Sequence, residues 1–265
     1  MAEIHPLLIG LTIALLLPAT VWTVSLFKRD VSIVDSLWSL LFLAVSLAYL
    51  LADEVASVRG LVDIALVVLW SLRLANYITW RNWGEPEDSR YAAMRLKHGK
   101  GFAFKSLYIV FLLQGLIAWI VAMPLYAAIS SDAPLGILDG IALLLVIAGV
   151  LFESLADYQL SAFRKDAGNH GKVMDRGLWR ESRHPNYFGE CCVWWGFFIF
   201  AVASGDWWTI ISPLLMTILL LRVSGVALLE KDIVERRPGY RDYIARTNAF
   251  IPGAPRHLRK VLLSR

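Results

Sequence analysis

The sequence predicts an all-α integral membrane protein with seven transmembrane helices, the N-terminus outside and the C-terminus in the cytoplasm. Of the 265 residues, 57% are hydrophobic and 18% are charged, whereas a soluble domain is about half apolar and about a quarter charged. The apolar residues gather into blocks of roughly the 20 residues that cross a bilayer. Lys and Arg are concentrated in alternate connections, which is the pattern of cytoplasmic loops.

The seven apolar blocks account for nearly the whole chain. The first block has neither a basic start nor a small-residue cleavage site, so we expect a persistent helix rather than a signal peptide. We therefore expect one membrane domain over residues 1–265. The blocks cover residues 6–27, 32–51, 61–80, 102–129, 137–160, 187–204 and 207–229.

The distribution of basic residues predicts the orientation. The connections after the first, third and fifth blocks, together with the tail, carry nearly all the Lys and Arg. The connections after the second, fourth and sixth blocks carry only Arg59. The net charge of +4 could suggest nucleic acid as a partner. Because the basic residues flank apolar blocks, as membrane topology requires, we expect no nucleic-acid binding.

Charged residues also occur within or beside the apolar blocks, where they are costly and commonly functional. Most lie near the predicted cytoplasmic ends, and a polar pocket opening to the cytoplasm would explain them together. The alternative is that each lies at the interface or pairs with another charge. They include Asp35, Glu153, Asp157, Glu190, Arg222 and Glu230.

The most specific local motif is Arg-His-Pro-Asn-Tyr-Phe-Gly-Glu at residues 183–190. Pro185 disfavours helix at His184, so a membrane helix starts here, and its free N–H groups favour an anionic ligand. Arg164 and Lys165 upstream are suited to phosphate groups, although cytoplasmic loops are basic in any case. The chain has no dinucleotide-binding glycine motif, no phosphate-binding loop and no zinc-ligand spacing, so we expect no metal.

These residues resemble the steroid 5-alpha-reductase family, particularly its bacterial members. The resemblance covers about residues 153–252, and sterol C14 and delta-7 reductases share the Arg-His-Pro-Asn-Tyr string. It implies NADPH bound by the later helices and their cytosolic loops, within residues 137–252. The residues that would line this site are Asp157, Arg164, Trp179, His184, Asn186, Tyr187, Glu190, Arg222, Glu230, Arg236 and Tyr243.

The resemblance also implies catalytic residues in the N-terminal half, where residues 1–130 would hold the substrate. The family has an acid in its second helix and a tyrosine in its third, beside the substrate carbonyl. Asp35 is similar to that acid, and Tyr77 is the best match for the tyrosine. Tyr91 is a second candidate. The steroid enzymes have Gln-Glu where this chain has Val34-Asp35.

The resemblance implies reduction of the carbon–carbon double bond of an enone, such as a 3-oxo-Δ4 steroid, in a bacterial inner membrane. We expect a lipid-soluble substrate and membrane lipids as partners, with no obligate protein partner. One alternative is a methyltransferase of the isoprenylcysteine carboxyl type, which has a similar Arg-His-Pro string and uses S-adenosylmethionine. Another is a transporter or a non-catalytic membrane scaffold.

Overall fold

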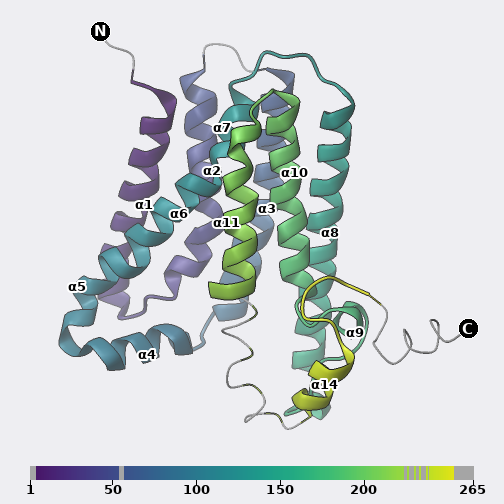
Figure 1. The fold of residues 1–265 in the computed structure, drawn as a ribbon. Coiled ribbons are helices and arrows are strands. Elements are labelled where there is room, and N and C mark those ends of the chain that lie inside the picture. Colours follow the sequence, from purple (N-terminus) through teal and green to yellow (C-terminus); the bar gives the residue numbers. More distant parts are fainter. Residues whose placement is uncertain are drawn as a thin grey trace, which may run out of the picture. The chain divides into compact units, whose positions relative to one another are not determined.

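The computed structural model describes residues 4–53, 57–223, 226, 230, 233, 237 and 239–253. In this part of the chain every regular element is a helix (Figure 1). One isolated β-bridge joins Ser182 to Asn248. The elements are α1 (Pro6–Lys28), α2 (Ile33–Ala52), α3 (Val58–Asn82), α4 (Ser89–His98), η1 (Gly99–Gly101), α5 (Phe102–Ser106), η2 (Leu107–Leu112), α6 (Leu113–Val121), α7 (Met123–Ile129), α8 (Ile137–Lys165), η3 (Ala167–Asn169), α9 (Leu178–Glu181), α10 (Pro185–Ala203), η4 (Trp207–Ile210), α11 (Ile211–Ile218), η5 (Leu219–Val223) and α14 (Tyr240–Arg246).

Among the described residues, six helical segments are long and apolar enough to cross a membrane, which supports a multi-pass membrane protein. They are α1, α2, α3, the run Ser89–Val121, α8 and α10. The remaining apolar helix, Trp207–Val223, is shorter. It covers most of the predicted seventh block, whose last six residues are largely outside the described part of the chain.

The helix starts follow local sequence signals. Pro6 and Pro185 begin α1 and α10, where proline is favoured because its missing N–H would have no helical partner. Ser57 and Asp88 precede α3 and α4, and each side chain accepts a hydrogen bond from a first-turn N–H. These caps stabilise a helix start by about 1 kcal/mol each.

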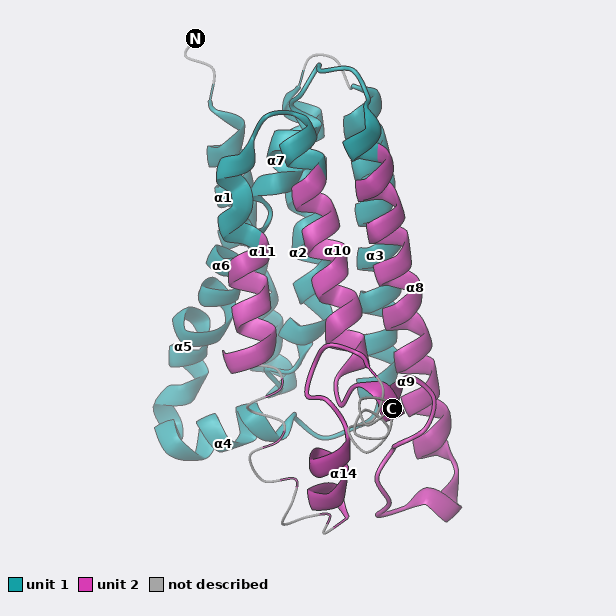
Figure 2. Ribbon diagram, turned by 45° about the vertical axis from the view of Figure 1, so that its right-hand side comes forward, with its two compact units in different colours: residues 1–139, 200–212 teal, residues 140–199, 213–265 magenta. Residues whose placement is uncertain are grey.

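The chain divides into two compact units (Figure 2). Unit 1 contains residues 1–139 and 200–212, and unit 2 contains residues 140–199 and 213–265. Unit 1 thus takes in most of the N-terminal half of the chain, and unit 2 takes in most of the C-terminal half. The exception is the short segment 200–212, which groups with unit 1.

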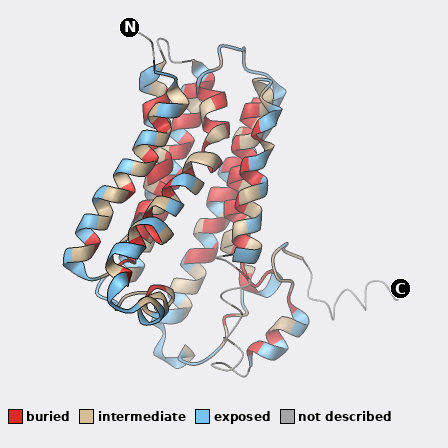
Figure 3. Ribbon diagram, turned by 60° about the vertical axis from the view of Figure 1, so that its left-hand side comes forward, coloured by how far each residue is buried: buried red, intermediate tan, exposed pale blue. Residues whose placement is uncertain are grey.

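Unit 1 is built on the hairpin of α2 and α3, with α1, α6 and α7 packed around it. Gly115 of α6 lies so close to α1 that any Cβ there would overlap the Ala14 carbonyl oxygen. Gly10 of α1 likewise faces the Tyr49 ring, 2.5 Å from the place a Cβ would take. Small residues thus allow close helix contact, as in other membrane bundles, and buried positions line the inner helix faces (Figure 3).

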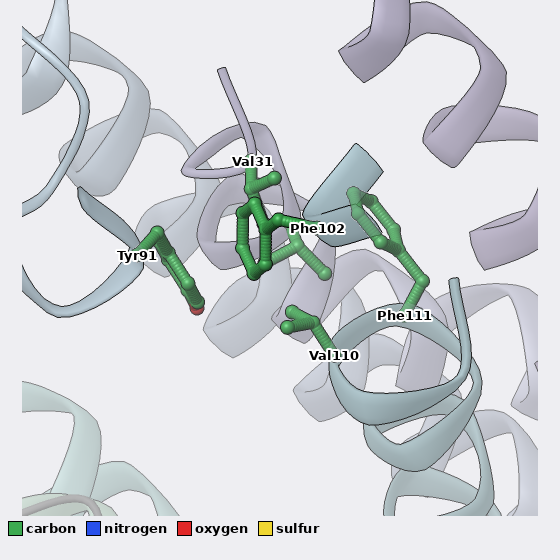
Figure 4. Packing of buried hydrophobic residues seen from close by; sticks show 6 residues of the cluster. Val31, Tyr91, Phe102, Val110 and Phe111 are labelled. Carbon is green, nitrogen blue, oxygen red and sulfur yellow. The ribbon is translucent and has the colours of Figure 1, made fainter. Parts of the chain in front are cut away.

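Also in unit 1, α4 and the α5–η2 segment enclose a hydrophobic cluster (Figure 4). Two side chains of the π-helical turn η2, Val110 and Phe111, belong to this cluster. The ring of Tyr91, from α4, belongs to it as well. π-Helical turns are rare and often occur at functional sites. The cluster consists of Val31, Val34, Tyr91, Phe102, Val110 and Phe111.

In unit 2, α8 and α10 pack through glycines. A Cβ on Gly149 would lie 2.7 Å from the Gly189 carbonyl oxygen, and one on Gly189 would lie 2.7 Å from the Glu153 backbone nitrogen. Two turns further along α10, a Cβ on Gly196 would lie 2.5 Å from the Val146 side chain. This contact fixes the N-terminal half of α10, where the Arg-His-Pro motif lies, against α8.

Candidate functional site

The first polar cluster lies in unit 1, where the start of α2 meets α4. The Tyr91 hydroxyl donates a 2.6 Å hydrogen bond to Asp35 Oδ1. Arg90 Nη2 donates to the other oxygen, Asp35 Oδ2, also at 2.6 Å. The Tyr91 ring is buried in the hydrophobic cluster, with its hydroxyl at the edge. Asp35 therefore accepts one bond from a phenol and one from a guanidinium.

Asp88 orients Arg90 for this contact. Arg90 Nε donates to Asp88 Oδ1 at 2.8 Å, and Nη2 donates to Asp88 Oδ2 at 3.2 Å. Although burial opposes ionisation, the hydrogen bonds and charge of Arg90 lower the pKa of Asp88 below its usual value. Arg90 thus bridges two carboxylates, and a continuous chain of hydrogen bonds runs from Asp88 to Tyr91.

The loop before α4 is tied to the turn between α1 and α2. Glu87 accepts hydrogen bonds from Arg95 at 2.6 and 2.9 Å and from the Val31 backbone N–H at 3.0 Å. The Arg95 bonds, opposed by partial burial, lower the pKa of Glu87. Ser32 Oγ accepts from the Asp88 backbone N–H at 2.7 Å. These bonds hold Arg90 and Tyr91 beside Asp35.

The two candidate tyrosines occupy different surroundings. Tyr91 bonds to Asp35 and accepts a long 3.4 Å hydrogen bond from Gln114 Nε2. Tyr77, near the end of α3, lies beside Trp80 with ring centroids 6.3 Å apart, and the Arg81 guanidinium is 5.8 Å from its ring centre. The structure therefore joins Tyr91 to Asp35 by a direct hydrogen bond.

The second polar cluster lies in unit 2, around the Arg-His-Pro motif. Arg183 forms a bidentate ion pair with Glu230, with Nε–Oε1 at 2.7 Å and Nη2–Oε2 at 2.9 Å. Its Nη1 donates to the backbone carbonyls of Thr247 at 2.7 Å and Ile244 at 3.3 Å. A cation at the C-terminal end of a helix is stabilised by the helix dipole. Arg183 thus connects Glu230 to the end of α14.

His184 and Tyr240 complete the surroundings of Glu230. His184 Nε2 lies 2.9 Å from Glu230 Oε1, and the Tyr240 hydroxyl donates to the same oxygen at 3.3 Å. Burial would raise the pKa of Glu230, but the bonds from His184 and Arg183 outweigh it and lower the pKa to about 2. The Glu230 carboxylate is therefore held by side chains of unit 2 itself.

Trp179 and Tyr243 form a further buried contact. Trp179 Nε1 donates to the Ala156 carbonyl at 2.9 Å, which joins α9 to α8. The Tyr243 hydroxyl donates to the backbone carbonyls of Trp179 and Ser182, the latter at 3.3 Å. Both polar atoms bond to backbone inside unit 2, so these two residues position α9 and α14.

The start of α10 contacts α8 through polar groups. Asn186 Nδ2 donates to Asp157 Oδ1 at 3.2 Å. The His184 and Tyr187 rings are stacked, with centroids 5.7 Å apart and planes 3° from parallel. Glu190, one turn further on, is buried. The hydrogen bond thus places Asp157 and Asn186 on facing sides of α8 and α10.

Several cations of unit 2 are exposed and could meet a phosphate-rich ligand. Arg164 and Lys165 are in the last turn of α8, and Arg222 is in the π-helical turn η5. Arg176 and Arg180 flank the start of α9 and are also exposed. Guanidinium groups match phosphate oxygens, so each of these exposed arginines could contact a phosphate group. Arg236 lies outside the described residues. Within the described residues, no three or more His, Cys, Asp and Glu side chains form a group that could hold a metal ion.

The comparisons with known proteins give a family. The family described as "Protein of unknown function (DUF1295)" matches residues 21–247. The chain belongs to the DUF1295 family. A relative from Schizosaccharomyces pombe, described as "Uncharacterized protein C594.04c", is 31% identical over 279 residues, covering 94% of this chain and 80% of the relative. No solved structure matches the chain.

The clusters of this DUF1295 chain contain residues that sequence reasoning did not assign to a site. Arg183 was part of the motif, yet nothing in its local sequence indicates an ion pair with Glu230, 47 positions later. Arg90 is next to Tyr91, and its contact with Asp35 spans 55 positions. The local signal that could have found Arg90 is the sequence Asp88-Ser89-Arg90, in which the acid caps the helix and holds the base.

Proposed function

We propose that this protein is a membrane-embedded, NADPH-dependent reductase of the carbon–carbon double bond of an enone, with a 3-oxo-Δ4 steroid or a similar flat lipid as substrate. The observation that carries the proposal is the 2.6 Å hydrogen bond between Tyr91 and Asp35. A buried phenol coupled to a carboxylate is suited to stabilise the negative charge that develops on a carbonyl oxygen. Tyr91 therefore replaces Tyr77 as our choice for the residue that polarises the carbonyl.

The direction of this hydrogen bond determines when Tyr91 can act. A phenol has one proton, and here Tyr91 donates it to one oxygen of Asp35, whose other oxygen accepts from Arg90. When Asp35 takes up a proton, it becomes the donor, and Tyr91 can donate its own proton to a substrate carbonyl. Arg90 and Asp88 position Asp35 for this exchange.

The cofactor would supply a hydride to the β-carbon of the double bond, leaving an enolate and NADP⁺. Tyr91 stabilises the enolate oxygen, and a proton from solvent or a side chain then completes the saturated ketone at the α-carbon. In unit 2, the exposed cations support a role in holding phosphate groups. Trp179, Tyr243, His184 and Glu230 bond within the unit, which supports a role in positioning α9 and α10 rather than in direct contact with the cofactor.

The proposal includes seven crossings, with the N-terminus outside and the C-terminus in the cytoplasm. The apolar helix Trp207–Val223 and the apolar residues after it in the sequence support a seventh span. The alternation of basic and non-basic connections supports the orientation. The likeness to bacterial reductases supports a location in a bacterial inner membrane.

Purified protein in detergent tests the proposal. We expect NADPH oxidation in the presence of one or more members of a panel of 3-oxo-Δ4 steroids and shorter enones, with the saturated ketone identified by mass spectrometry. A thermal shift with S-adenosylmethionine and none with NADPH would instead favour the methyltransferase alternative. Solute uptake by proteoliposomes without binding of either cofactor would favour the transporter.

A further inference from the structure

A second acidic residue is buried in unit 1, away from the Asp35 cluster. Asp63 lies in the second turn of α3 and is fully buried. Both of its carboxylate oxygens are inaccessible to solvent, and within the described part of the chain neither has a hydrogen-bond partner. The other acid near this end of unit 1, Asp139, is paired with Arg59 and also accepts from the Gly136 N–H.

Arg59 is the basic residue nearest to Asp63 in the sequence, but it does not pair with Asp63. Arg59 is one helical turn away on α3, yet each of its three nitrogens has other partners. Nε and Nη2 donate to Asp139 at 2.7 and 3.1 Å, Nη1 donates to Ser131 at 2.9 Å, and Nη2 also donates to the Pro134 carbonyl at 3.1 Å. The positive charge of Arg59 is thus balanced by Asp139 at the N-terminal end of α3.

A second polar group lies at the level of Asp63 on the neighbouring helix. Ser39 Oγ of α2 donates to the Ser71 carbonyl of α3 at 2.9 Å, which fixes the register of the antiparallel pair. Two turns along α2 from Ser39 is Ser46, and the same step back along α3 from Ser71 reaches the turn that contains Asp63. Ser46 is fully buried, and its hydroxyl likewise has no partner among the described residues.

An unpaired carboxylate inside a helical bundle is costly, and the cost is greater in a membrane. Such a group is stable when its charge is neutralised by a bound cation. The solvent-inaccessible surroundings of Asp63 favour a compact cation over an amine or a larger ligand. Membrane proteins use carboxylate, hydroxyl and backbone oxygens for this purpose when they bind sodium ions or protons.

We propose that Asp63 and Ser46 form a binding site for a small monovalent cation inside unit 1. The Asp63 carboxylate neutralises the charge, and the Ser46 hydroxyl supplies a further oxygen. Sodium and a proton share this chemistry, and the experiment below distinguishes them. The inference does not depend on the proposed reductase activity, because it rests only on the burial and the unsatisfied oxygens of these two residues.

The test is the thermal stability of the purified full-length protein under two series of conditions. One series replaces choline chloride by sodium chloride at constant ionic strength, and the other varies pH in choline chloride. For a sodium site we expect Tm to rise by about 5 °C at saturating sodium. For a proton site we expect a similar rise as the pH falls, with no effect of sodium.

Variants assign the effect to the site. Asp63→Asn should abolish the response to sodium, or remove the part of the pH response that Asp63 causes, whereas Asp132→Asn, which removes an exposed acid of the same unit, should retain the wild-type response. Ser46→Ala keeps the carboxylate and should weaken the cation affinity, which provides a second variant if Asp63→Asn does not fold. The proposal is overturned if Tm of the wild type responds to neither series, or if the Asp63→Asn or Ser46→Ala protein responds as the wild type does.

Discussion

Arg59 and Asp139 form a bidentate ion pair that is almost fully buried in unit 1, with Arg59 1% and Asp139 6% exposed at the side chain. Arg59 was the one basic residue that departed from the predicted charge pattern of the connections. The ion pair explains this departure, because the charge of Arg59 is neutralised within the protein. It also joins the start of α3 to the start of α8, 80 positions apart.

Removal of one member of this pair should be strongly destabilising. Arg59→Met leaves Asp139 buried without its counter-charge, which we expect to cost about 3–5 kcal/mol. The double variant with Asp139→Leu should lose less than the sum of the single variants, because no unpaired charge remains. Thermal unfolding in detergent measures the stability losses of the single and double variants. Arg176→Met, which removes an exposed arginine, is the control. Additive losses would contradict the pairing.

The glycine contact between α8 and α10 predicts an effect of a single methyl group. Gly189→Ala places a Cβ 2.7 Å from a backbone nitrogen of α8, so the helices must separate, at a cost of about 1–3 kcal/mol. Gly140→Ala, at a position on α8 with open space around it, should be neutral or slightly stabilising, since alanine favours helix. The test is the midpoint of unfolding of each variant. Equal midpoints would show that α8 and α10 are not in close contact at Gly189.

Glu230 makes the stability of unit 2 depend on pH in the acid range. Its pKa is lowered from 4.5 to about 2 in the folded protein, so the folded state favours the ionised form. This stabilisation is complete above pH 4.5 and is lost as the pH falls toward about 2. Glu230→Gln should therefore be less stable than wild type at neutral pH. The difference between their free energies of unfolding should become smaller as the pH falls from 4.5 to about 2.

The matched control for this measurement is Glu181→Gln, which removes an exposed carboxylate of the same unit and should follow the wild-type curve. Glu87, whose pKa is also lowered, is present in all three proteins. Its contribution to the pH dependence is therefore the same in each and does not affect the differences between them. Chemical unfolding at several pH values, monitored by tryptophan fluorescence, gives the free energies. A constant difference between Glu230→Gln and wild type would show that the Arg183 and His184 contacts do not lower this pKa.

Much of the fold was predictable because membrane spans are encoded locally. The apolar blocks at residues 6–27, 32–51 and 137–160 correspond to α1, α2 and α8 within a few residues at most ends. The fourth block was predicted as one helix, whereas the structure has a π-helical turn at Leu107–Leu112 and a break after Val121. A π-turn depends on how the helix packs, so the composition of an apolar run does not reveal it.

The candidate sites were predictable only where the residues are close in sequence. The Arg-His-Pro motif marked the start of α10, and Pro185 is its first residue. The partners of Asp35 could not be inferred in this way, because Arg90 and Tyr91 reach it through the path of the loop before α4. The position of a tyrosine in the third helix instead favoured Tyr77, whose local sequence carries no information about Asp35.

The comparison of Tyr91→Phe with Tyr77→Phe is the sharpest test of the substrate-side assignment. Tyr91→Phe removes the phenol that bonds to Asp35 and keeps the ring within the hydrophobic cluster. Loss of one donor to a developing oxyanion lowers turnover by about 10²–10³-fold, so we expect this decrease in kcat with little change in the affinity for NADPH. Tyr77→Phe should retain most of the activity. A decrease confined to Tyr77→Phe would return the role to Tyr77, and NADPH binding by both variants would show that the cofactor assignment is independent of this result.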